Sequence, residues 1–165
     1  MYVWCKTMNE TGTTTRSNLR ADTPYFTYHN MNPKGKHTGD CVIRAIAYAL
    51  NKDWHEMVDE LVGYTHKYMI PYDYAPLYER YLKDHGYVRV PQQKNSEGKV
   101  CTVYEVCRKL DRLGISKPVL MHVRPHHLTV VSRIDGVMKV IDIWNSNTHR
   151  AGKLYIHEDD MERWE

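Results

Sequence analysis

The sequence lacks most of the features that mark specialised classes of protein. Its 165 residues include one Phe, no internal repeat and no apolar run that approaches the roughly 20 residues needed to span a bilayer. The formal net charge is only +3, without a basic run that would suggest a nucleic-acid partner. The start does not resemble a signal peptide, because Asn9, Glu10 and Arg16 interrupt it. We therefore expect a cytoplasmic protein with neither a membrane nor a nucleic acid as its partner.

Metal and redox motifs are also missing. The four cysteines, at positions 5, 41, 101 and 107, form no CxxC pair, and a reducing compartment keeps them as thiols. We interpret Cys5, Cys101 and Cys107 as structural. The histidines invite a zinc hypothesis, but their spacing does not place them on one helical face and no Cys adjoins them; they are His122, His126, His127 and His149. We expect no metal site and no cofactor.

The rest of the composition is that of a globular protein. Hydrophobic residues make up 42% and charged residues 26%, and the length fits one domain over residues 1–165. Residues 1–30 are polar and weakly patterned and are candidates for an extended arm, with short strands expected at 1–6 and 25–28. Thirteen Tyr residues stand out, several of them between Tyr64 and Tyr78. Because Tyr joins apolar area to a polar tip, some of them are candidates for lining a groove or partner surface.

Hydrophobic periodicity divides the remaining sequence into a helical half and a strand half. Helices are expected at 41–50, after the N-cap Asp53, at 74–85, and from the capping box of Thr102 and Glu105 to Gly114. After Pro118 the period becomes strand-like, at 118–123, 128–134 and 137–144, with a candidate edge strand at 153–156. Asp135-Gly136 predicts a two-residue hairpin turn. The order predicts an α+β fold with helices packed on an antiparallel sheet.

Cys41 is expected in the first turn of the first helix. Unpaired amides and the helix dipole at this position favour a thiolate, which is the nucleophilic form of cysteine. Asp40 opposes this effect, so an imidazolium is needed nearby. The alternative is that Cys41 is only a small buried residue at the start of a core helix.

The hairpin suggests where that imidazole comes from. An Asp135-Gly136 turn pairs Thr129 with Asp142 and His127 with Trp144, which places these four side chains on one face of the sheet. Asp142 can then orient His127 while Trp144 shields the pair from water. His126 falls on the opposite face, although one β-bulge would reverse that choice. The alternative interpretation is a surface His and a solvated Asp, and Trp54 is expected far from this group.

Three short motifs resemble papain-like thiol hydrolases. Gly39-Asp40-Cys41-Val42-Ile43-Arg44-Ala45-Ile46 resembles the nucleophile helix, His127-Leu128-Thr129-Val130-Val131 the strand led by the catalytic His, and Asp142-Ile143-Trp144 the family's Asn-x-Trp. A closer resemblance is to small phage- and prophage-encoded members. The resemblance implies a papain-like fold, a catalytic triad of Cys41, His127 and Asp142, and hydrolysis of a peptide, protein or small amide in a bacterial host cytosol.

One position departs from this family's pattern. Where papain-like enzymes place a Gln that donates to the oxyanion, this sequence has Gly35, so the backbone amide of Cys41, Asn32 and Thr38 are the remaining candidate donors. Because Gly35 replaces that Gln and Tyr is abundant, a second function is also considered. In that alternative the fold is a non-catalytic binding module, a phage inhibitor or sponge of host defence whose ligand is a host protein or a nucleotide.

Overall fold

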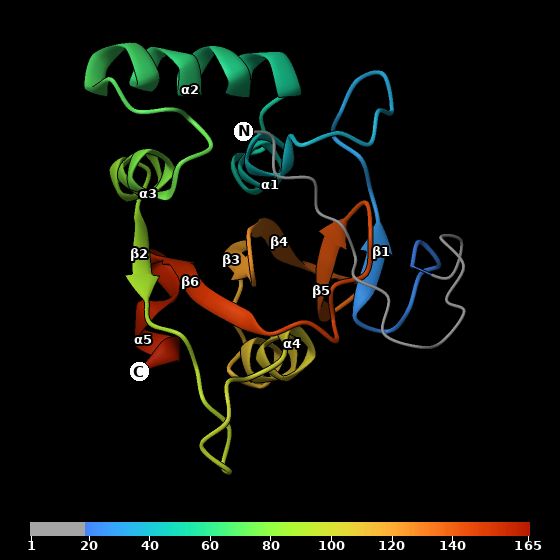
Figure 1. Cartoon of the computed structure of the whole chain (residues 1–165). Helices are drawn as coiled ribbons and strands as arrows, with labels where there is room; N and C mark the ends of the chain where they lie inside the picture. The colour runs from blue at the N-terminus through green and yellow to red at the C-terminus, as the bar shows by residue number, and fades with distance from the viewer. Residues whose placement is uncertain (1–18) are drawn as a thin grey trace.

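The chain folds around a six-stranded sheet with helices on both of its faces (Figure 1). The computed structural model describes residues 19–165, so Cys5 and the strand predicted at 1–6 lie outside the described residues. The elements are β1 (Phe26–Tyr28), α1 (Cys41–Leu50), α2 (Trp54–Tyr68), α3 (Ala75–Asp84), β2 (Tyr87–Val90), α4 (Val103–Arg112), β3 (Val119–Val123), β4 (His127–Ile134), β5 (Val137–Asp142), β6 (Ala151–His157), a 3-10 turn (Glu158–Asp160) and α5 (Met161–Trp164). None of the helices in this range has the length and apolar character needed to cross a bilayer.

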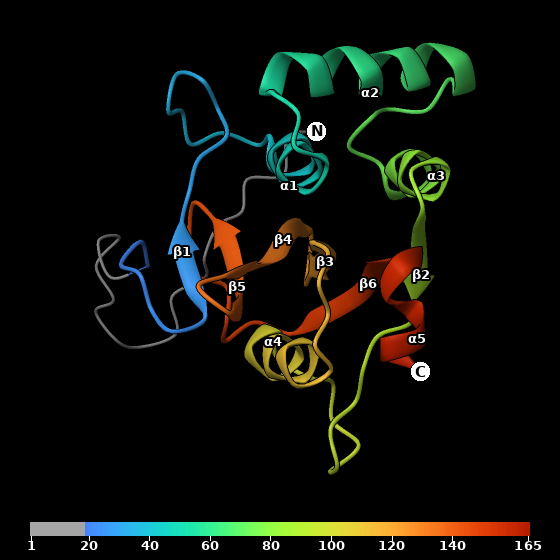
Figure 2. The same cartoon turned by 180° about the vertical axis from the view of Figure 1, so that it is seen from behind.

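The sheet separates two hydrophobic cores. Helices α1, α2 and α3 cover one face, and α4 covers the other (Figures 1 and 2). Alternate residues of the central strands point into the two cores. Leu120 and Val130 belong to the core with α1, whereas Met121 and Val131 belong to the core with α4. This alternation follows from the two-residue period of a strand. The predicted α+β class is therefore confirmed.

Local sequence signals explain most of the elements. The Asp53 side chain accepts from the Glu56 amide at the start of α2, and Thr102 and Glu105 form the predicted capping box of α4. Asp135 and Gly136 both have positive φ, 50° and 81°, as a type I′ turn requires. The strands that they join pair from Ile134 with Val137 to Val130 with Ile141, which is the predicted register.

The prediction of a purely antiparallel sheet is wrong at one edge. β1 pairs in parallel with β5, with Phe26 opposite Val140 and Tyr28 opposite Asp142. The only Phe of the sequence, Phe26, anchors this strand. Its side chain is fully buried in the hydrophobic core between the sheet and α4. The sheet is consequently mixed.

The other edge also differs from the sequence-based expectation. The segment expected as an edge strand, now β6, lies inside the sheet between β3 and β2. The true edge is β2, a four-residue strand that was not predicted because Val88 and Arg89 at its centre are both exposed and give no alternation. The short α5 at the chain end was not predicted either.

Candidate active site

The candidate catalytic residues meet at one end of the sheet. Strands β1 and β5 end there, β4 begins there, and the first turn of α1 lies against it. The chain leaves β1 through His29, whose amide donates to the backbone carbonyl of Asp142 at 2.9 Å. Four segments that are far apart in the sequence are thereby brought together.

His127 and Asp142 form a close, buried pair. The distance from His127 Nε2 to Asp142 Oδ2 is 2.6 Å, and the two residues are 3% and 5% exposed. The Thr129 hydroxyl donates to the same carboxylate oxygen at 2.7 Å. The pairing of β4 with β5 shows no register shift, and the neighbouring His126 is exposed. The structure thus brings together three of the four residues that strand parity placed on one face, and His127 is the histidine that faces Asp142.

Cys41 is the first residue of α1 and is partly exposed. Burial of the sulfur raises the pKa of the Cys41 thiol, but a hydrogen bond with His127, the positive charge of that imidazole and the Leu128 backbone outweigh it. The net result is a Cys41 pKa below its ordinary value. The other two described cysteines differ: Cys101 and Cys107 are buried, and burial raises the pKa of Cys107 to about 12.

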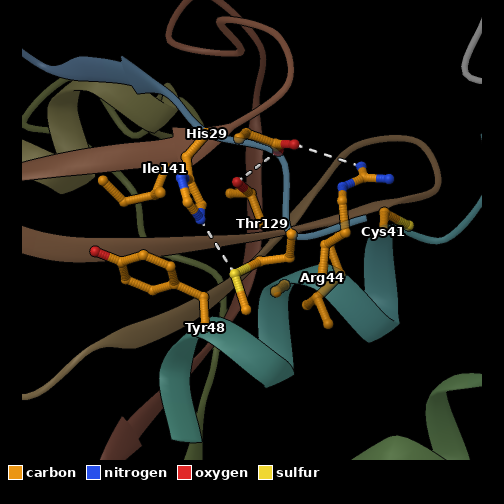
Figure 3. Close-up of a pocket in the computed structure, with 10 residues that line it drawn as sticks. His29, Cys41, Arg44, Tyr48, Thr129 and Ile141 are labelled. Atoms are coloured by element: carbon orange, nitrogen blue, oxygen red, sulfur yellow. Dashed lines mark hydrogen bonds and ion pairs between the residues drawn. The ribbon is translucent and has the colours of Figure 1, made fainter. Parts of the chain in front are cut away.

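Arg44 is a member of the site that the sequence analysis did not single out. This residue is 6% exposed, forms an ion pair with Asp40, and places Nη2 3.5 Å from Asp142 Oδ1. Figure 3 labels both Arg44 and Thr129, and its dashed lines mark the contact that each of them makes with that carboxylate. A lone Arg in an otherwise apolar helix, four residues after an Asp, is the signal that points to such a pair.

Asp142 keeps its charge in spite of its burial. Burial alone raises the pKa of a carboxyl group, but the charge and hydrogen bond of His127, the charge of Arg44 and the hydrogen bond from Thr129 outweigh it. The pKa of Asp142 is therefore lowered. An ionised Asp142 is the form that can orient an imidazole and stabilise its protonated state.

Asp40 is surrounded by donors instead of capping α1 with its side chain. Besides Arg44, its carboxylate accepts from Trp54 Nε1 at 2.9 Å and from Asn32 Nδ2 at 3.0 Å. The expectation that Trp54 lies far from the site is wrong, because the first turn of α2 packs directly on the start of α1. The helix periodicity of α2 showed which face is buried but not which neighbour covers it.

The two side chains suggested as oxyanion donors lie on the loop that enters α1. Asn32 is buried and accepts from the amides of Lys34 and Lys36 at 3.0 and 3.3 Å, while one of its own N–H groups is engaged by Asp40. Thr38 is exposed, and its backbone carbonyl accepts from Arg44 at 3.3 Å. Both residues brace this loop, and their donation to an oxyanion stays a prediction.

Trp144 lies where the hairpin register predicts. Its ring centroid is 5.0 Å from that of His127, with the planes inclined by 49°, and it also contacts His149 edge-on at 4.9 Å. Trp144 is only partly buried. It therefore covers the outer side of the imidazole.

One cavity is lined by Cys41, and a larger groove lies beside its sequence neighbours. Behind the thiol is a cavity of about 10 Å³, room for a single water, between α1 and the strand ends; its lining residues include His29, Arg44, Tyr48 and Asp142 (Figure 3). A larger groove of about 220 Å³ runs beside the residues that precede Cys41, and is lined by Thr38, Gly39, Asp40, Ile43, Trp54, Val58 and Tyr72.

Of the Tyr cluster, Tyr72 alone lines this groove. Tyr78 is buried, and burial, aided by the charges of Glu79 and Cys41, raises the pKa of Tyr78 to about 12. Tyr74 is exposed. Within residues 19–165, no three His, Cys, Asp or Glu side chains are grouped in a way that could hold a metal ion.

Comparison with protein families, with curated proteins and with solved structures finds no match to this chain. What the site can do therefore follows from its own residues: a partly exposed cysteine at a helix N-terminus, an imidazole that lowers the pKa of its thiol, and a buried carboxylate bonded to that imidazole.

Proposed function

We propose that the protein is a cysteine-dependent acyl-transfer enzyme of papain-like type, most simply a hydrolase of a peptide, isopeptide or related amide. The observation that carries this proposal is the buried pair of His127 and Asp142, with Nε2 2.6 Å from Oδ2, next to a Cys41 thiol whose pKa His127 lowers. A nucleophile, a base and a group that orients the base are the parts that acyl transfer needs.

The proposed reaction uses these residues in turn. His127 takes the thiol proton, and the Cys41 sulfur attacks the carbonyl carbon of the substrate. The C–N bond then breaks, the amine leaves with the proton held by His127, and a thioester on Cys41 remains. His127 next removes a proton from water, whose oxygen attacks the thioester; the acid is released and Cys41 is restored. The Cys41 backbone amide contributes a donor to the developing oxyanion.

A small activated ester tests this chemistry without knowledge of the natural substrate. With p-nitrophenyl acetate, the protein is expected to release a burst of nitrophenolate that matches its own concentration, and intact-mass analysis should find one acetyl group on Cys41. Cys41→Ala and His127→Ala should remove the burst, whereas Cys101→Ser, at a buried thiol, should retain it. Acetylation spread over other residues, or equal in Cys41→Ala, would show that Cys41 is no catalytic nucleophile.

A non-catalytic binding module is the second candidate. It is favoured by Gly35, which is exposed, has φ of 62° and brings no side chain that could donate to an oxyanion. The resemblance to phage-encoded proteins suggests a host protein or a nucleotide as the ligand. Cys41→Ser separates the candidates in any phenotype that the protein confers on a bacterial host: a folded variant that retains the phenotype favours binding, and loss of the phenotype favours catalysis.

A further inference from the structure

Arg44 connects two buried carboxylates near the candidate nucleophile. One carboxylate is Asp40, the residue directly before Cys41, and the other is Asp142, the partner of His127. All three residues are 6% exposed or less. Because buried charges interact more strongly than charges in water, the sign and position of each of them affects a thiol in the same site.

The two oxygens of Asp142 have different partners. Oδ2 receives His127 and Thr129, and Oδ1 faces Arg44 at 3.5 Å as well as the amide of Ile143 at 2.7 Å. This arrangement leaves the carboxylate few ways to rotate. The guanidinium is thus placed to hold Asp142 in the orientation in which its other oxygen meets the imidazole.

Arg44 also offsets the negative charge of Asp40, which opposes a thiolate at Cys41. An unpaired carboxylate next to Cys41 would disfavour the negative sulfur. Arg44 forms a buried ion pair with Asp40, and Trp54 and Asn32 add two neutral donors. The positive charge of Arg44 is itself among the causes of the low Cys41 pKa.

We propose that Arg44 is a positioning residue for the Cys41–His127 pair, holding Asp142 toward His127 and neutralising Asp40 beside Cys41. The inference rests on the proposed function, because it assumes that the pair works as thiolate and imidazolium. The titratable and charged groups around Cys41 are Asp40 directly before α1, Arg44 from α1, His127 from β4 and Asp142 from β5, with Tyr78 from α3 and His29 from the loop after β1.

The test is the pH profile of Cys41 alkylation by iodoacetamide, followed by peptide mass analysis in the full-length protein. Arg44→Met should move the profile to higher pH and slow labelling at pH 6.5 about ten-fold, the effect of one pKa unit on the thiolate fraction. Arg44→Lys, which keeps the charge, should restore most of the rate. Asp40→Asn should move the profile in the opposite direction, because it removes the negative charge beside Cys41.

A purely structural role for Arg44 predicts a different pattern, in which Arg44→Met and Asp40→Asn shift the alkylation profile of Cys41 in the same direction. If Arg44→Met proves unstable, the double variant Asp40→Asn with Arg44→Met removes both charges of the pair and should give a profile between those of the single variants. The inference is overturned, while the proposed function stands, if folded Arg44→Met has the alkylation profile of the wild type. It is equally overturned if the double variant has the alkylation profile of Asp40→Asn alone. An ordinary thiol profile in the wild-type protein overturns both.

Discussion

Thr129 donates its hydroxyl to the same oxygen of Asp142 that His127 contacts, at 2.7 Å. The carboxylate is thus tied to β4 at two positions of one strand face. Replacing Thr129 by Val keeps the shape of the side chain and removes this donor.

We expect Thr129→Val to destabilise the protein by about 1.5–3 kcal/mol, the range for a hydrogen bond to a charged group. The nitrophenolate burst should become slower but not disappear, since His127 keeps its own contact. Urea unfolding and burst kinetics measure the two effects. Thr129→Ser, which retains the hydroxyl, is the matched control, and an equally slow burst in both variants would show that packing and not the hydrogen bond is responsible.

The adjacent histidines provide an internal comparison. His127 is buried against Asp142, whereas His126 is exposed before the strand begins. His127→Ala should raise the titration of Cys41 toward the ordinary thiol value of about 8.5 and abolish acetylation. His126→Ala should leave the alkylation profile of Cys41 unchanged. A profile that responds to His126 and not to His127 would refute the register used here.

Trp144 covers the imidazole without being fully buried. Trp144→Ala should therefore cost less than the roughly 3–5 kcal/mol that is typical for a fully buried Trp, yet it should shift the Cys41 alkylation profile because water reaches the His127–Asp142 hydrogen bond. Trp164→Ala is the control, since Trp164 packs in the core on the α4 side and under the Lys109 amine. A comparable shift in both variants would mean that general loosening is the cause.

Acid should weaken the fold through Asp142. Its folded pKa is lowered, so the stability from its ionisation is present above the unfolded pKa of about 3.9 and is lost as the pH falls through the lower folded value. Asp142→Asn should cost about 3–5 kcal/mol at pH 7, because Arg44 and His127 lose a buried partner, and the remaining stability should fall less steeply below pH 4.

Asp160 is a matched control for that measurement. This residue is fully buried, and burial raises the pKa of its carboxyl group, but hydrogen bonds from Ser116, Lys117 and Arg163 outweigh it and lower the pKa. Asp160→Asn should also flatten the acid limb of the unfolding curve, measured by urea midpoints from pH 7 to pH 3. It should leave Cys41 alkylation as in the wild type. Equal acid slopes in wild type and Asp142→Asn would contradict the assigned charge of Asp142.

Local chemistry explains why part of the site could be predicted from sequence. The Asp135-Gly136 turn determines the register of β4 and β5, and that register alone brings His127, Thr129 and Asp142 together. The helix start at Cys41 follows from the polar loop before it and the apolar residues after it.

Other parts depend on contacts that leave no local pattern. The parallel pairing of β1 with β5 joins segments that are far apart in the sequence, and the three residues of β1 are too few to show a period. The contact of Trp54 with Asp40 depends on how α2 crosses α1, which the hydrophobic face of α2 does not determine. The spacing of Arg44 four residues after Asp40 points to the first of its carboxylate partners, but the second, Asp142, is not recognisable without the packing.

The parallel edge pairing of β1 also affects how the protein folds. β1 can pair only after β5 has been synthesised, which follows all of the intervening helices and strands. Contacts of such large sequence separation form slowly because a long loop has to close first. The loop from His29 to Asp40 leaves this late strand and leads directly into Cys41. During refolding, the enhanced reactivity of the Cys41 thiol should thus return only with the last stage of sheet closure, which makes this thiol a chemical reporter of complete folding.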